Sequence, residues 1–146
     1  MTTTNTTYSF ADVTCVISHS SVGQKSVNGL GIGKITVAYL DNLTESDLGA
    51  DGAVMVTKVE SARCKISLEI QQTSSLNKWL LTYANTVRTA ESSVWAGGTI
   101  KITENFTNGA AITASYCSLI KRPDRSDAQQ GDHVTWEFLS THTEEY

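Results

Sequence analysis

The residues that could support catalysis do not form a complete catalytic pattern. Ser75 and Lys78 match S-x-x-K, which places a nucleophilic serine and a lysine on adjacent helix turns, but the companion K-T-G motif is absent. His19, His133 and His142 are far apart, and no patterned carboxylate or thiol accompanies them, so spacing assembles neither a triad nor a zinc site. We expect Ser75 to belong to a helix cap and each histidine to lie in an exposed loop or at a strand end. The sequence predicts no enzyme.

The cysteines and glycines also lack the spacing of a metal or cofactor site. Cys15, Cys64 and Cys117 lie in apolar runs without a CxxC pattern, so we expect buried, reduced thiols. The glycines of residues 29–33 do not follow G-x-G-x-x-G, and a predicted strand follows them instead of a helix. We therefore predict no nucleotide site and no cofactor.

Segment 41–52 (DNLTESDLGADG) has the strongest local charge bias in the chain. It contains Asp41, Glu45, Asp47 and Asp51 and no basic residue. The ligand order of an EF-hand loop, D-x-[DN]-x-[DN]-G, is absent. A metal site, a solvated loop and a contact with another subunit are the three interpretations of this segment, and we predict no metal.

One basic cluster could complement that acidic segment. Lys121, Arg122 and Arg125 surround Pro123, the single proline of the chain. The cluster fits a solvated loop equally well. If it binds a second copy of the chain, several charge pairs would add specificity to the contact.

Length and composition predict one turn-rich β domain spanning residues 1–146. The net charge of -4 argues against a basic surface that grips nucleic acid. No apolar run approaches the roughly 20 residues of a membrane span, so we expect no membrane anchor. The N-terminus lacks the charged and apolar regions of a signal peptide, which predicts folding in the bacterial cytoplasm.

Hydrophobic periodicity then predicts the elements of this domain. Residues 65–71 alternate apolar and polar side chains, which is typical of a strand with one buried face. Residues 76–87 repeat apolar side chains every three or four positions after a Thr-Ser-Ser cap, which predicts an amphipathic helix ending near Thr89. Similar alternation predicts strands at 11–18, 34–39, 99–106, 110–121 and 134–138. The predicted core comprises Ile66, Leu68, Ile70, Leu76, Trp79, Leu80, Tyr83, Ile100, Ile102, Trp136 and Phe138.

The connections are predicted from turn residues. Residues 20–33 read as a long flexible connection, and Val54 begins a strand that continues through a bulge at 60–62 into 63–71. Asn108-Gly109 predicts a two-residue type I′ hairpin, which would place Ile100 opposite Cys117 and leave strand 110–121 covered on both faces. Trp95 is expected to be a core anchor. Together these elements predict a small β-sandwich or barrel of about seven strands with one helix packed on it.

The chain resembles the tail tube proteins of contractile-tailed bacteriophages. The resemblance rests on the order of GADGAVM (49–55), an alternating strand, TSSLN (73–77) and a helix ending in YAN (83–85). The opening YSFADV (8–13) and the closing GDHVTWEF (131–138) also fit, so it covers nearly the whole chain.

This resemblance implies a structural virion protein rather than an enzyme. Family members form hexameric rings whose sheets join into a continuous barrel, and the rings stack into a tube inside a contractile sheath. The implied partners are further copies of the chain, the tail sheath protein, baseplate and tail-terminator proteins, and viral DNA that passes through the lumen without specific binding. The implied location is the virion tail, with assembly in the host cytoplasm.

The resemblance also suggests roles for particular segments. Residues 1–7 would form a flexible arm, 41–52 an inter-ring loop and 140–146 a polar C-terminal tail. The acidic segment would meet Lys121, Arg122 and Arg125 of the next ring. Polar strand faces would line the lumen because DNA must pass without adhering, and the candidates are Thr36, Ser67, Glu69, Gln71, Thr99 and Thr103.

Two alternatives remain open at this point. The first is a soluble β-sandwich that binds a sugar or another small ligand beside Trp95. The second is the tube protein of a related injection or secretion system, which would keep the fold and change the cargo.

Overall fold

The computed structural model describes residues 4–27 and 29–146. A short 3-10 helix (Phe10–Asp12) precedes nine strands and one α-helix. In chain order the elements are β1 (Val13–His19), β2 (Gly23–Ser26), β3 (Ile32–Tyr39), β4 (Thr44–Leu48), β5 (Val54–Lys58), β6 (Cys64–Gln71), α1 (Ser75–Arg88), β7 (Gly98–Glu104), β8 (Ala111–Lys121) and β9 (His133–Glu145).

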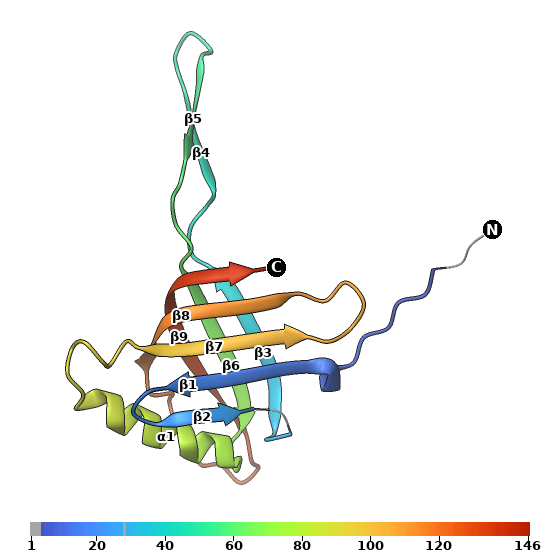
Figure 1. Cartoon of the computed structure of the whole chain (residues 1–146), viewed down its shortest axis with the longest axis vertical. Helices are drawn as coiled ribbons and strands as arrows, with labels where there is room; N and C mark the ends of the chain where they lie inside the picture. The colour runs from blue at the N-terminus through green and yellow to red at the C-terminus, as the bar shows by residue number, and fades with distance from the viewer. Residues whose placement is uncertain (1–3, 28) are drawn as a thin grey trace.

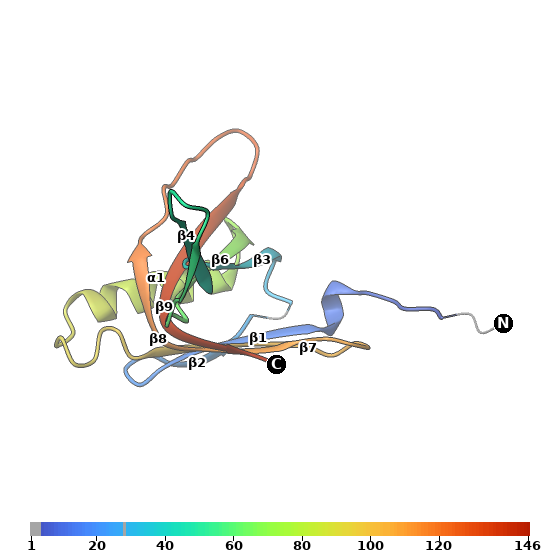
Figure 2. The same cartoon turned by 90° about the horizontal axis from the view of Figure 1, so that it is seen from above.

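Seven of these strands form one curled, antiparallel sheet. Its order is β2-β1-β7-β8-β9-β6-β3, so β2 and β3 are the two edge strands. The sheet bends so strongly that β3 and β6 cross behind β1 and β7 (Figure 1), and the view from above shows a half-barrel (Figure 2). The predicted fold class, mainly β with one packed helix, is confirmed.

Helix α1 packs its apolar stripe onto the inner face of this sheet. Ser74 caps the helix, because its Oγ accepts a hydrogen bond from the Leu76 amide at 3.1 Å. Tyr83 contacts Phe138 edge to face with 5.9 Å between ring centroids, and the Trp136 indole donates to Asn77 at 3.0 Å. The predicted core residues are buried, except that Trp79 is only partly covered.

The long connection predicted between the first two strands was wrong in part. Gly23–Ser26 forms β2, which pairs with β1 from Val16↔Ser26 to His19↔Gly23. In β2 only Lys25 is partly buried. The segment GQKS therefore lacks the alternation of apolar and polar residues from which a strand is predicted. Residue 28 of this connection lies outside the described residues.

His19 lies at the end of β1, as predicted, but it is buried, and Trp95 is exposed instead of lying in the core. His19 is buried: the Ser21 amide donates to its Nδ1 at 3.0 Å, so Nε2 carries the proton given to the Val94 carbonyl at 2.9 Å. Trp95, expected in the core, is 43% exposed. The turn at residues 91–97 supplies the carbonyl that satisfies His19 and leaves the indole outside.

The predicted β7–β8 hairpin has a different turn and register. Asn108 has φ 64°, but Gly109 does not have the positive φ that a type I′ turn needs. The connection spans residues 105–110, and Ile100 pairs with Ala114 instead of Cys117. A bulge at Tyr116, whose φ is 54°, then turns Cys117 inward onto the same face as Ala114. Tyr116 itself is 65% exposed, so the strand is not covered on both faces along its whole length, although Cys117 and Ser118 are both buried.

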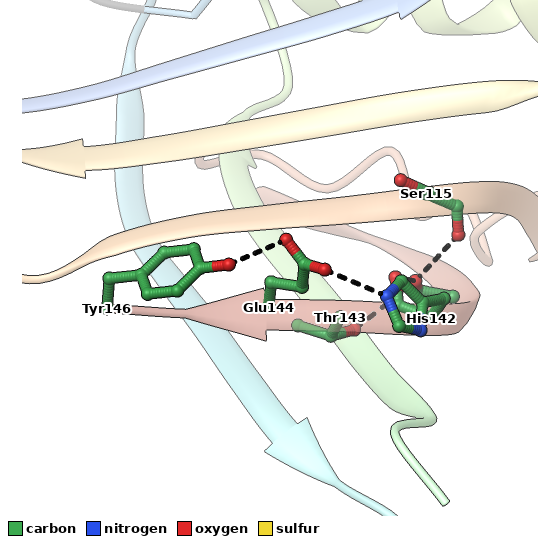
Figure 3. Close-up of polar contacts among 6 residues, drawn as sticks. Ser115, His142, Thr143, Glu144 and Tyr146 are labelled. Atoms are coloured by element: carbon green, nitrogen blue, oxygen red, sulfur yellow. Dashed lines mark hydrogen bonds and ion pairs between the residues drawn. The ribbon is translucent and has the colours of Figure 1, made fainter.

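The C-terminal residues expected to form a polar tail are instead the last part of β9. Tyr146 exchanges two backbone hydrogen bonds with Ala111, at 2.9 and 3.0 Å. Figure 3 shows Glu144 between His142 and Tyr146: it lies 3.2 Å from His142 Nε2 and accepts the Tyr146 hydroxyl at 2.9 Å. Of the predicted N-terminal arm, residues 4–7 are exposed and form no helix or strand, and residues 1–3 lie outside the described part.

Candidate assembly interfaces

The acidic segment is half of a projecting hairpin. β4 and β5 pair with each other in a separate two-stranded sheet, and every residue in both strands is exposed. Figure 1 shows this hairpin standing clear of the main sheet at one end of the long axis. The expectation that β5 runs on into β6 was wrong, because residues 59–63 separate the two strands and β5 turns back on β4.

The β4–β5 hairpin has two chemically different faces. Cross-strand partners share a face, so Leu48 lies beside Val54, and Val56 lies opposite Ser46. These three apolar side chains are 62% to 72% exposed. Glu45 and Asp47 point to the opposite face together with Met55 and Thr57. The hairpin therefore presents an apolar face and an acidic face to its surroundings.

A charged clamp closes the stem of the hairpin. Arg63, directly before β6, donates from Nε and Nη2 to the two carboxylate oxygens of Asp41, each at 2.8 Å. The Ser61 hydroxyl donates to the same carboxylate at 2.5 Å. These hydrogen bonds lower the pKa of Asp41 to about 2. Asp41 is thus engaged within its own chain, unlike Glu45 and Asp47 on the projecting strand.

The tip of the hairpin is organised by backbone hydrogen bonds. The Gly49 amide donates to the Ala53 carbonyl at 2.7 Å, and the Gly52 amide donates to the Gly49 carbonyl at 3.0 Å. Gly52 has φ 90°, which a side chain would strain. Asp51 accepts the Ala53 amide at 3.1 Å, so this predicted contact residue also shapes the turn.

The structure divides the predicted basic cluster between two places. Lys121 and Arg122 line a pocket of about 430 Å³ that also involves Trp95 and Arg88 from the end of α1. Arg125 instead lines a pocket beside the start of α1 and lies 3.4 Å from Asp127. Arg88 was not predicted to join this cluster, because it lies 33 positions before Lys121 and has no basic neighbours in the sequence.

The hairpin and the basic loop lie at opposite ends of the sheet. Residues 59–63 lead from the hairpin into the first residue of β6. At the other end of that strand, Gln72 donates to the Ser126 carbonyl and to Asp127, at 3.1 and 2.8 Å. An eight-residue strand spans roughly 25 Å, so a substantial distance separates the two surfaces.

The predicted lumen residues all lie on the outer face of the curled sheet, in two groups. Thr36 pairs with Ser67 across β3 and β6, and Glu69 lies opposite Lys34. Gln71 ends β6 on the same face. Thr99 and Thr103 lie on β7, opposite Ser18 and Thr14 of β1. Strands β8 and β9 separate the two groups.

Among the described residues, no group of His, Cys, Asp and Glu side chains could hold a metal ion, and no helix is long and apolar enough to cross a membrane. Cys15, Cys64 and Cys117 are all buried. Burial raises the pKa of Cys15 to about 12 and that of Cys117 to about 11, which suits structural rather than reactive thiols.

Solved structures with this fold include chains of the anti-feeding prophage and of an extracellular contractile injection system. The chain matches the tube-terminating cap of the anti-feeding prophage with a TM-score of 0.62 and 7% identity, covering 100% of this chain and 95% of that one. It matches a chain of the sheath-tube complex of an extracellular contractile injection system (PVC) with a TM-score of 0.58 and 11% identity, covering 94% and 90%. A chain of the anti-feeding prophage baseplate gives a TM-score of 0.59 and 12% identity, covering 98% and 97%. No curated protein sequence matches the chain.

A match to a protein-family model shows which family the chain belongs to. Residues 5–146 match the bacteriophage PhiTE tail tube protein family, so the chain belongs to that family. It is a structural protein of the phage tail tube and not an enzyme. The resemblance drawn from segment order is confirmed, and the sugar-binding alternative has no support from the family.

Proposed function

We propose that the protein assembles into hexameric rings that stack into the inner tube of a contractile phage tail, inside a sheath and between baseplate and terminator proteins. The tube conducts the genome into the host after assembly in the host cytoplasm. The observation that carries this proposal is the exposed β4–β5 hairpin. An isolated two-stranded hairpin is marginally stable in water, and one with three exposed apolar side chains calls for a partner.

Ring formation would use the edges of the main sheet. β2 and β3 each have a single neighbour in the sheet, which leaves a row of backbone groups for pairing with another chain. Joining β2 of one subunit to β3 of the next would continue the sheet around a central axis. Helix α1 covers the inner face of the curled sheet (Figure 2), so the outer face would be the one that lines the lumen.

Stacking would use the two ends of each subunit. The hairpin projects from one end of the sheet, and Lys121, Arg122 and Arg125 belong to the other end. In a stack of rings, the acidic side chains of one hairpin would therefore meet the basic end of a subunit in the next ring. These acidic side chains are Glu45, Asp47 and Asp51. A head-to-tail contact of this kind is not self-complementary and continues into an open filament.

The outer face of the sheet supplies the wall of the channel. Its candidates are Thr36, Ser67, Glu69, Gln71, Thr99 and Thr103, which are uncharged or acidic, and the same face also carries Lys34, Lys65 and Lys101. Changing Glu69 to Lys should slow genome ejection from the assembled phage. Unaltered ejection kinetics would remove Glu69 from the channel wall.

Removal of the hairpin tests the stacking role. Replacing residues 44–58 with a short Gly-Ser linker deletes only exposed strands and leaves the core intact. We expect the shortened chain to form rings that do not stack, while the full chain forms tubes, as seen by negative-stain electron microscopy. Tubes of normal length from the shortened chain would contradict the proposed role of the hairpin.

A further inference from the structure

The pocket beside Trp95 combines an apolar floor with a cationic rim. Its floor is formed by Ala84, Val87 and Ala90 around the end of α1, by Leu119 of β8 and by Trp95. Its rim carries Arg88, Lys121 and Arg122. Trp95 is 43% exposed, so its indole contributes apolar surface to this site. We call this site the Trp95 pocket.

The hairpin has the complementary composition. Leu48, Val54 and Val56 form its apolar face, and Glu45 and Asp47 lie on the opposite face of the same narrow ribbon. A two-stranded ribbon whose apolar face lies on the floor keeps its carboxylates on the upper face, where only the long arginine side chains that rise from the rim would reach them. Apolar contact at the centre and charge pairs around it are typical of specific protein interfaces.

We infer that the Trp95 pocket receives the β4–β5 hairpin of a second copy of this chain in the adjacent ring. Val54 and Val56 contact the floor at Trp95 and Leu119, and the carboxylates pair with Arg88 and Arg122. This inference rests on the proposed function and identifies the surface that the hairpin binds. It assigns Arg122 to the contact and leaves Arg125 outside it.

The positions of the two surfaces agree with this docking. The hairpin lies at one end of the long axis and α1 at the other, as Figure 1 shows. Five-residue strands extend by roughly 16 Å, so the hairpin reaches well beyond its own sheet. Its stem is clamped by Asp41 and Arg63 and its tip by backbone hydrogen bonds, which reduces the entropy lost on binding.

Arg125 provides an internal comparison. It lies in the same loop as Arg122 but beside Asp127, and it lines the pocket at the start of α1 instead of the Trp95 pocket. Charge reversal at the two positions makes the same chemical change in one loop. Only the change at Arg122 should abolish stacking.

Cysteine cross-linking between copies tests the contact directly. Chains carrying Val56→Cys and chains carrying Ala90→Cys are assembled together and oxidised, and covalent dimers are counted on a non-reducing gel. The matched control replaces Val56→Cys by Met55→Cys, which is equally exposed but faces the other way. We expect dimers from Val56→Cys and a loss of that product with Met55→Cys. Equal cross-linking by both, or none in assembled tubes, overturns the inference.

A mixing experiment separates this inference from the proposed function. Val54→Asp with Val56→Asp disables the hairpin, and Arg88→Glu with Arg122→Glu disables the pocket. Each variant alone should give unstacked rings, and the mixture should give two-ring stacks that grow no further. Tubes from the pocket variant overturn the inference and leave the proposed function intact. A wild-type chain that never forms rings overturns both.

Discussion

At the residue scale, Asp41 shows how one side chain of a charged segment can differ from its neighbours. The sequence groups it with Glu45, Asp47 and Asp51, but the structure pairs it with Arg63 at the stem of the hairpin. The bidentate geometry suits a guanidinium and fixes the direction in which the hairpin leaves the sheet. Asp41 therefore positions the projecting strands, and the remaining acidic residues are available for contact.

This role predicts the titration of Asp41. Hydrogen bonds from Arg63 and Ser61 lower its pKa from 3.8 to about 2. Because the pKa is lowered, the stabilisation is present above pH 3.8 and is lost as the pH falls through about 2. Carboxyl-carbon NMR of the subunit should report this low pKa, and Arg63→Ala should return it towards the ordinary value. A pKa that Arg63→Ala leaves unchanged would refute the clamp; Arg63→Lys, which keeps the charge, should give an intermediate value.

At the element scale, the periodicity of apolar residues in the sequence was sufficient to predict the strands and the helix that bury one face. β6 and α1 were predicted because Ile66, Leu68 and Ile70 alternate and because Leu76, Leu80 and Tyr83 repeat at helical spacing. β2 and β4 were missed because their side chains are almost all exposed, so nothing in them alternates between core and solvent. The bulge in β8 depends on a positive φ at Tyr116, which a sequence pattern does not reveal.

The candidate contact surfaces were predictable only in part. Local charge bias drew attention to the acidic segment and the basic cluster, and their role in contacts stays a prediction. The sequence did not place Arg88 beside Lys121 or separate Arg122 from Arg125, because tertiary packing brings the end of α1 to the end of β8. The exposure of Trp95 also depends on the 91–97 turn, which meets His19 through the Val94 carbonyl.

The cap of α1 gives a prediction at this scale. Ser74 accepts the Leu76 amide, and its hydroxyl also donates to the Leu30 carbonyl, which ties the helix start to the segment before β3. Ser74→Ala should lower the free energy of unfolding of the isolated subunit by about 1 kcal/mol. Urea denaturation at low protein concentration measures this loss. Ser75→Ala is the control, and an equal loss in both variants would show that the cap at Ser74 is not the cause.

At the scale of the whole molecule, the fold combines two properties that a tube subunit requires. A packed core of one helix and a curled sheet makes each subunit rigid. The two sheet edges and the projecting hairpin then leave contact surfaces in different directions, which in the proposed assembly would face ring neighbours and the next ring. Family membership establishes the tail tube as the setting, and the geometry accounts for how one chain can extend a tube without a second type of subunit.

Cryo-electron microscopy of the purified full-length chain, concentrated at near-physiological salt, tests this account most directly. We predict hollow tubes of uniform width with six subunits in each ring, the hairpin of one ring in contact with the next ring, and the outer sheet face towards the lumen. A monodisperse monomer at every concentration, or filaments without a channel, would contradict it.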